Sequence, residues 1–198
     1  MGDQVLGEPA RATGQGSTET DRDLVLAART DPRAFGTLYD HYVDTVYRYL
    51  YRQTGVAEAA EDLTSLTFLR ALAALDRFDP HRPVTPWLMR IAHNALVDHR
   101  RTAARTMRLS EEIVSALVAE ADPRAGSNVE QAEAFLAFTA GLPEDQRDAL
   151  ALRFIADLSV EQTAAALGRS VGATKMLVSR ALAALRSSAM ARKEETCD

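Results

Sequence analysis

The stretch from Ser159 to Arg186 constrains the fold most, because its local signals divide it into two helices separated by a tight turn. Ser159, followed three residues later by Gln162, forms a capping-box pattern in which each side chain satisfies a backbone N–H of the first helical turn. Gly168 is the residue type that most easily takes the left-handed conformation ending a helix, and Ser170 can cap the next helix. The stretch therefore predicts helix, glycine turn and helix.

The second of these helices is expected to present a basic surface. Its outward residues are predicted to be Arg169, Ala173, Met176 and Arg180, whereas helical spacing places an apolar set on the inner face: Val171, Val178, Ala181, Leu182 and Leu185. From Gly168 to Lys193 the charged residues are all positive, although the formal net charge of the chain is −5. This geometry is typical of a recognition helix in a DNA major groove. An αα-hairpin with a solvated basic face is the alternative.

Composition predicts an all-α fold. Of the 198 residues 46% are hydrophobic, with many Ala and Leu and no period-2 alternation of the kind found in strands. No apolar run approaches the roughly 20 residues of a membrane span, and the N-terminus lacks a signal-peptide pattern. We therefore expect a cytoplasmic protein without membrane insertion. The single cysteine, Cys197, excludes an internal disulfide.

Helix signals and composition divide the chain into two small helical domains joined by a flexible linker. Asp31 followed by Pro32 predicts a helix start, Gly55 a helix end, and the Thr85–Pro86 pair another start. The second domain is expected to contain a helix whose buried face carries Leu150, Ala151 and Phe154. The expected organisation is a disordered leader at 1–22, a first domain at 23–102, a linker at 103–130, a second domain at 131–191 and a charged tail at 192–198.

Two helices of the first domain have unusual faces. The helix expected at 56–78 is apolar on two sides, so it lies between two neighbours or keeps one side for a partner. The helix expected from Trp87 to about Arg101 carries an outer strip of Trp87, Arg90, Asn94 and Arg101, which suits phosphates and unstacked bases. The alternative for Trp87 is a role in anchoring the core.

The residues of an active site are not found in the sequence. The four histidines do not form an i, i+4 pair around a glutamate, and neither a phosphate-binding glycine loop nor a G-x-S-x-G motif occurs. We therefore expect no enzyme activity, no metal site and no cofactor.

Three ordered blocks resemble bacterial RNA polymerase sigma factors of the extracytoplasmic-function group of the sigma-70 family. The blocks are AEDLTSLTFLRA within the helix at 56–78, TPWLMRIAHNALVDHRR after it, and LPEDQRDALALRFIADLSVEQTAAALGRSVGATK near the C-terminus. The resemblance covers residues 23–190, and no additional region of the kind found in housekeeping sigma factors fits between 102 and 131. It implies a sigma region 2 in the first domain and a sigma region 4 in the second.

The resemblance also implies partners and site residues. The factor would bind the β′ clamp and β flap of core RNA polymerase, recognise promoter DNA, melt the −10 element and be held by an anti-sigma factor. Polymerase contacts are expected at Asp62, Leu63, Thr67 and Phe68. Contacts to the −10 element are expected at Trp87, Arg90, Asn94 and Arg101. Contacts to the −35 element are expected at Lys175, Met176, Ser179 and Arg180, and at Arg169 of the basic face.

One departure from the family pattern lies in the recognition helix, where Met176 and Leu177 stand in place of a serine and an arginine. Fewer polar contacts to the −35 element are expected from this change. Two other functions fit the C-terminal motif: a helix-turn-helix regulator that acts without core polymerase, and a helical interaction module that binds no DNA.

Overall fold

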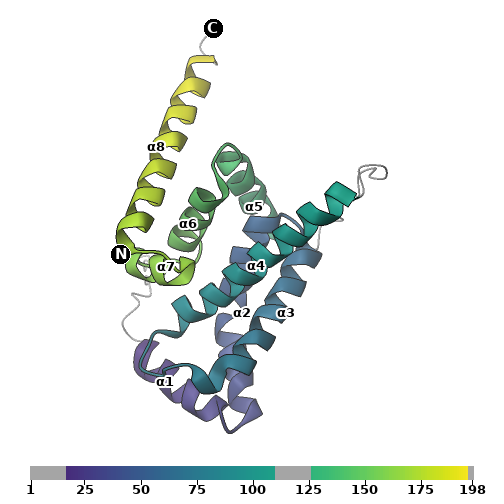
Figure 1. The fold of residues 1–198 in the computed structure, drawn as a ribbon, viewed down its shortest axis with the longest axis vertical. Coiled ribbons are helices and arrows are strands. Elements are labelled where there is room, and N and C mark those ends of the chain that lie inside the picture. The colour runs from purple at the N-terminus through teal and green to yellow at the C-terminus, as the bar shows by residue number, and fades with distance from the viewer. Residues whose placement is uncertain (1–16, 110–125, 196–198) are drawn as a thin grey trace, which may run out of the picture.

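The computed structural model describes residues 17–109 and 126–195, and within these ranges it consists of helices (Figure 1). The first module comprises α1 (Ser17–Ala28), α2 (Pro32–Thr54), α3 (Ala57–Ala74), the short 3-10 helix η1 (Leu75–Arg77) and α4 (Val84–Leu109). The second module comprises α5 (Gly126–Thr139), α6 (Glu144–Phe154), α7 (Val160–Leu167) and α8 (Val171–Glu195). The predicted all-α class is confirmed.

The local signals for helix ends are confirmed where they were strongest. Asp31 caps α2, its carboxylate accepting a hydrogen bond of 2.8 Å from the backbone N–H of Arg33, and Gly55 ends this helix with a φ of 69°. Ser159 and Gln162 form the complete capping box of α7, and Gly168 ends that helix with a φ of 64°. The left-handed conformation favours glycine at both positions.

Three helices extend further than the sequence signals predicted. Helix α1 begins at Ser17 within the predicted leader, and Asp21 is buried, because this helix packs along α2. Helix α4 continues to Leu109 and α5 begins at Gly126, so both enter the predicted linker. The residues after Arg101 include good helix formers and lack glycine and proline, so nothing stops α4. Helix α8 likewise continues to Glu195. The rest of the predicted leader, linker and tail lies outside the described residues.

The buried face of α8 differs from the predicted one. Ser170 caps the helix by accepting a hydrogen bond of 3.2 Å from the backbone N–H of Ala173. The inner residues are Thr174, Leu177, Ala181 and Leu185, whereas Val171 is exposed. The predicted face was therefore shifted at its N-terminal end, because α8 packs against α7 as well as against α6.

The two modules pack against each other. Helix α7 lies against α4, and both α5 and α6 lie against α2 (Figure 1). The main cluster of buried apolar residues runs without interruption from α1–α4 into the second module, where it includes Ala132, Ala151, Leu152, Ala156, Leu158 and Ala166. A smaller cluster around Leu142, Leu150, Ala181 and Leu185 joins α6 to α8. Close contact of the modules thus involves apolar burial as well as polar bonds.

Candidate nucleic-acid interface

The start of α4 holds an aromatic pair beside a structured loop. The rings of Trp87 and Phe78 lie 4.3 Å apart between centroids and are tilted by 30°. Arg29 of α1 donates hydrogen bonds to the backbone carbonyls of Leu75 and Phe78, which fixes the loop that follows η1. Trp87 is half-buried, so it both anchors this corner and leaves part of its ring accessible.

A hollow of about 400 Å³ lies along α4 beside this aromatic pair. It is lined by Trp87, Arg90, Ile91 and Asn94 of α4 and by Arg70 and Ala74 of α3. Arg70 lies 3.1 Å from Asp98 in an exposed ion pair. The hollow thus brings together a ring edge, cationic groups and an amide, which are the groups that hold an unstacked base and its phosphate. Arg101 is exposed further along α4 and does not line the hollow.

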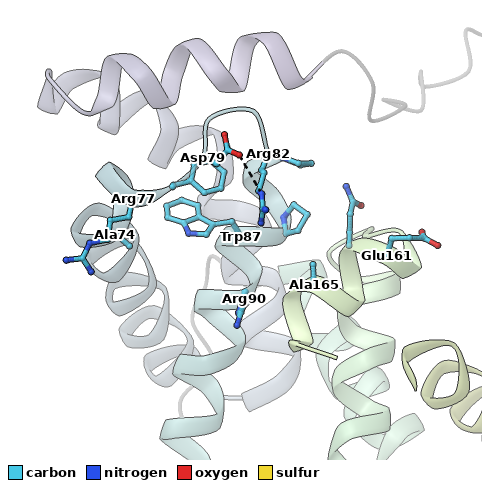
Figure 2. Close-up of a pocket in the computed structure, with 12 residues that line it drawn as sticks. Ala74, Arg77, Asp79, Arg82, Trp87, Arg90, Glu161 and Ala165 are labelled. Atoms are coloured by element: carbon cyan, nitrogen blue, oxygen red, sulfur yellow. Dashed lines mark ion pairs between the residues drawn. The ribbon is translucent and has the colours of Figure 1, made fainter. Parts of the chain in front are cut away.

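A larger pocket, of about 660 Å³, lies between the aromatic corner and the second module (Figure 2). Figure 2 shows Arg77, Asp79, Arg82, Trp87 and Arg90 on one side and α7 on the other. The contribution of α7 consists of Glu161, Gln162 and Ala165. Arg77 and Arg82 were not among the predicted site residues, and the folding of the loop brings them to Trp87.

The exposed face of α8 contains four of the five predicted −35 residues. Lys175, Met176, Ser179 and Arg180 lie on one side of the helix and are exposed, Met176 by 52%. Leu177 is only 8% exposed, so of the two departures from the family pattern only Met176 changes the outer surface.

Arg169 is separated from this set. It precedes α8 and lies 3.8 Å from the Asp145 carboxylate of α6. Arg169 also lines a hollow of about 380 Å³ with His93 and Val97 of α4. In this conformation Arg169 thus contacts α6 and faces a hollow shared with α4.

Three of the four residues predicted to contact polymerase are buried in the free chain. Leu63, Thr67 and Phe68 are buried, with Phe68 packed on Tyr39 at 4.6 Å between ring centroids. In this conformation they lie beneath the surface of α3. Asp62 is exposed.

The opposite side of α3 carries a strip that is open to solvent. Leu69 is 66% exposed and Leu72 is 48% exposed, while Asp62 and Ser65 continue the strip toward the start of the helix. Leu69 and Leu72 belong to the two different apolar sides expected for this helix, so each side is partly buried and partly exposed. The alternative in which both sides are buried is therefore excluded.

A buried carboxylate at the module interface was missed by the sequence analysis. The side chain of Asp148 on α6 is 6% exposed and accepts hydrogen bonds of 2.9 Å and 3.2 Å from Arg100 of α4. Gln53 of α2 donates a further bond of 3.1 Å to Asp148 and accepts one of 2.8 Å from Arg100. These residues are 48 and 95 positions from Asp148 in the chain, so no local pattern could indicate them.

His93 completes this polar cluster. Burial lowers the pKa of its imidazole; the Asp148 carboxylate at 3.8 Å opposes this effect, while Arg100 and Arg169 add to it. Burial outweighs the carboxylate, so the neutral form is favoured. The Tyr49 hydroxyl lies 3.3 Å from Nδ1 of His93, within hydrogen-bonding distance, and the tautomer of the ring sets which of the two donates.

Comparison with known proteins decides the family. The family model described as Sigma-70 region 2 matches residues 38–106, and the one described as Sigma-70 region 4 matches residues 132–185. The chain is 30% identical over 166 residues to the ECF RNA polymerase sigma factor SigW of Bacillus subtilis, covering 79% of this chain and 89% of SigW. This chain belongs to the ECF group of RNA polymerase sigma factors.

Two further similarities support the assignment. The sigma factor is 40% identical over 156 residues to the ECF RNA polymerase sigma factor BldN of Streptomyces coelicolor, a match that covers 77% of this chain and 59% of that relative. Its fold matches the sigma factor RpoE of Bartonella quintana, solved in complex with the anti-sigma factor NepR, with a TM-score of 0.65 and 26% identity, covering 77% of this chain and 94% of RpoE. The predicted family, with its regions 2 and 4, is confirmed.

Membrane-spanning helices and metal-binding clusters are both absent from the described residues of this sigma factor. None of its helices in the ranges 17–109 and 126–195 is long and apolar enough to cross a membrane. Within the same ranges, histidine, cysteine and acidic side chains do not gather in groups of three that could hold a metal ion.

Proposed function

We propose that this sigma factor binds core RNA polymerase and directs initiation at promoters whose −35 and −10 elements it recognises through separate modules. The observation that carries the proposal is the presence, on one chain of this family, of three distinct exposed surfaces: the apolar strip on α3, the aromatic and cationic hollow on α4, and the basic face of α8. An operator-binding regulator needs only the last of these. The domain limits proposed for these roles are 23–102 and 131–191.

The hollow on α4 is proposed to hold the melted −10 strand. A base extruded from a duplex costs a few kcal/mol, which stacking and hydrogen bonds must offset. The accessible part of the Trp87 ring is proposed to supply stacking, Arg90 a phosphate or base contact, and Asn94 an amide that can bond a base edge. Arg101, exposed further along α4, is proposed to contact the backbone of the same strand.

The face of α8 is proposed to read the −35 duplex. Arg180 and Lys175 supply cationic donors, and Ser179 a hydroxyl that suits either strand. Met176, 52% exposed, adds an apolar group that can contact a thymine methyl. Arg169 is proposed to join this face only after its ion pair with Asp145 is released.

The exposed strip on α3 is proposed as the contact with the β′ clamp. Leu69 and Leu72 provide the apolar centre of the strip, and Asp62 a charged rim, which is the usual arrangement of a protein interface. Leu63, Thr67 and Phe68 support the strip from below. The second module is proposed to contact the β flap. An anti-sigma factor, such as the one bound to the structural relative RpoE, is a further expected partner.

The place and chemistry of action follow from these roles. The protein is proposed to act in the cytoplasm, bound to polymerase on DNA, without catalytic residues or a cofactor of its own. Bond formation during transcription belongs to the polymerase, and this chain would supply recognition and strand separation.

Reconstitution tests the proposal directly. Purified protein added to core RNA polymerase is expected to co-elute with it and to start transcripts at a subset of genomic promoters, mapped by sequencing of transcript 5′ ends. Failure to bind core polymerase would overturn the proposal. Tight sequence-specific binding to duplex DNA without polymerase would instead favour the helix-turn-helix regulator.

A further inference from the structure

The corner that holds Trp87 is tied to the end of α1 by an arginine side chain. Arg29 follows the last residue of α1 and reaches the segment between α3 and α4. Its Nε donates a hydrogen bond of 3.3 Å to the carbonyl oxygen of Leu75, and its Nη2 donates one to the carbonyl oxygen of Phe78. Leu75 is the first residue of η1 and Phe78 is the residue that caps its end. One guanidinium therefore bridges the two ends of this short helix.

The backbone at Arg29 is itself fixed by the turn between α1 and α2. The backbone N–H groups of Thr30 and Asp31 donate hydrogen bonds of 3.1 Å and 2.9 Å to the carbonyl oxygen of Ala27. Val25 of α1 is fully buried where this helix packs along α2. Because its backbone is fixed in this way, Arg29 can transmit the position of the packed helices to the segment that it bonds.

The residue at the far end of this bridge supports the tryptophan ring. Phe78 is buried, and its ring centroid lies 4.3 Å from that of Trp87. The backbone of Phe78 leaves η1 in an extended conformation, with a φ of −73° and a ψ of 133°. A rotation about these bonds would move the ring away from Trp87. The hydrogen bond to the Phe78 carbonyl thus restrains the backbone conformation in which the two rings meet.

Beyond Phe78, the loop is shaped by contacts among its own exposed residues. The backbone N–H of His81 donates a hydrogen bond of 3.0 Å to the Asp79 carboxylate, and that of Arg82 donates one of 3.0 Å to the Asp79 carbonyl oxygen. The side chains of Arg82 and Asp79 form an ion pair at 3.7 Å (Figure 2). Exposed pairs of this kind add little stability. These contacts do not attach the loop to the helices, so the two bonds from Arg29 carry much of that attachment.

Arg29 lies outside the part of the chain that matches the family models. The match to Sigma-70 region 2 begins at residue 38, after α1 and the turn that follows it. Trp87 and the other residues expected to bind the −10 element lie within the match. The role of Arg29 is therefore inferred from its contacts in the fold.

We propose that Arg29 is a positioning residue for the hollow on α4: by holding the two carbonyl groups, it keeps the ring of Trp87 in the orientation that stacks on an unstacked base. This role rests on the proposed function, since it concerns capture of the −10 strand. Arg29 does not line the hollow. Loss of its charged hydrogen bonds frees the aromatic corner to adopt other orientations, and strand capture then falls with the fraction of molecules that remain oriented.

The first readout is the fluorescence of Trp87, the single tryptophan of the chain. Quenching by acrylamide reports access to its ring and requires neither polymerase nor DNA. Arg29→Ala is expected to raise the quenching constant of the folded protein. Arg29→Lys is expected to give an intermediate value, because a compact ammonium cannot span two carbonyl groups as the guanidinium fork does. Unchanged quenching in both variants would overturn the proposal.

Arg22→Ala is the matched control. Arg22 lies on the same helix and is exposed, and its replacement removes the same charge from the chain. It is expected to change neither quenching nor promoter opening. Circular dichroism verifies that each variant retains its helices. If Arg29→Ala does not fold, Arg29→Lys decides the test.

Promoter opening by the holoenzyme gives the second readout. The fluorescence of 2-aminopurine placed in the −10 element of a promoter mapped for this sigma factor reports strand separation. Arg29→Ala is expected to lower the equilibrium constant for opening at least about tenfold, the size of a lost hydrogen bond from a charged donor, and to leave the affinity for core polymerase unchanged.

The remaining outcomes separate this role from the sigma function. Altered quenching with normal opening would overturn the role of Arg29 in strand capture. Equal losses in polymerase affinity and in opening would overturn it in favour of a general structural role. If the parent holoenzyme opens no promoter, the proposed function fails and this role fails with it, whereas quenching still records whether Arg29 holds the aromatic corner.

Discussion

The coupling free energy between Arg100 and Asp148 is the most direct measure of the module interface. Removing one partner of a buried ion pair costs about 3–5 kcal/mol, because the other charge stays buried without a partner. The side chains of Arg100 and Asp148 are 19% and 6% exposed, and Gln53 remains near either survivor. We therefore expect each single substitution to cost the lower end of this range. The double-mutant cycle is expected to give a coupling energy of about 2 kcal/mol.

The assay uses the single tryptophan of the chain. Trp87 lines the pocket between the modules, so its fluorescence reports both undocking and unfolding, while circular dichroism at 222 nm reports the helices alone. Urea titrations of the parent, Arg100→Ala, Asp148→Ala and the double variant yield the four free energies of the cycle. If undocking precedes unfolding, the fluorescence transition comes first and the cycle is computed from that transition.

A second ion pair of similar length provides the control for this cycle. Arg70 and Asp98 lie 3.1 Å apart, but within the first module and with side chains that are 41% and 54% exposed. Exposed pairs couple by about 0.2–1 kcal/mol. If the coupling between Arg100 and Asp148 falls within that range, the interface is open to water in solution and the reasoning from burial is refuted.

Three further predictions concern partners, promoter reading and pH. Leu72→Lys is expected to leave stability within about 0.5 kcal/mol, because the site is exposed, and to weaken binding to core polymerase at least about tenfold in a fluorescence titration, whereas Met190→Lys, at another exposed apolar site, does neither. Arg180→Ala in the holoenzyme is expected to weaken binding to −35 DNA by about 1–3 kcal/mol with relaxed specificity at one base pair, whereas Arg186→Ala weakens it uniformly or not at all. Burial lowers the pKa of His93 while the modules are docked, so a chain with separated modules binds more protons. The docked arrangement is therefore fully stable above about pH 6.5 and loses stability as the pH drops below it. Distances between spin labels on the two modules that respond equally to acid in His93→Gln would contradict this assignment.

Local signals predicted the helix boundaries where one residue decides the backbone conformation. Asp31, Gly55 and Gly168 act within four residues of their own position, and all three behave as expected. Helices extend across the expected boundaries at residues 22, 102 and 131. For α1 and α5 the reason is that α2 packs against them, which no local pattern contains. For α4 the helix-forming residues after Arg101 are sufficient.

Faces of helices were harder to predict than their existence. Phe154 was expected in the core but is 58% exposed, with the Arg153 guanidinium 5.4 Å from its ring centroid. Val171 was expected on the inner face of α8 but is exposed. A shift of one position moves a residue by 100° around a helix of 3.6 residues per turn, so the face assigned to a side chain depends on the direction of the neighbouring helices. Family motifs have the same weakness, as the burial of Leu63, Thr67 and Phe68 shows.

The strip on α3 is open to solvent while the two modules are docked, and this sets an order of events. Leu69 and Leu72 are exposed while the modules are docked, so polymerase can engage α3 before the interface opens. Opening then uncovers the buried residues Leu152 and Leu158 along with Asp148, which disfavours the open chain in water. To shift the ratio of open to docked chains from 1:99 to 99:1, polymerase must bind the open chain more tightly by about 5.5 kcal/mol.

Binding of α3 to polymerase can supply this difference in binding free energy. Once α3 is bound, the contact of the second module with polymerase becomes an intramolecular step at high effective concentration. A clamp fragment that binds α3 alone gains nothing from opening. It is therefore expected to bind the parent and Asp148→Asn with equal affinity, while complete core polymerase distinguishes them by at least about fivefold. If the fragment and the complete enzyme both bound Asp148→Asn more tightly than the parent by the same factor, α3 would be hidden while the modules are docked, and opening would come first.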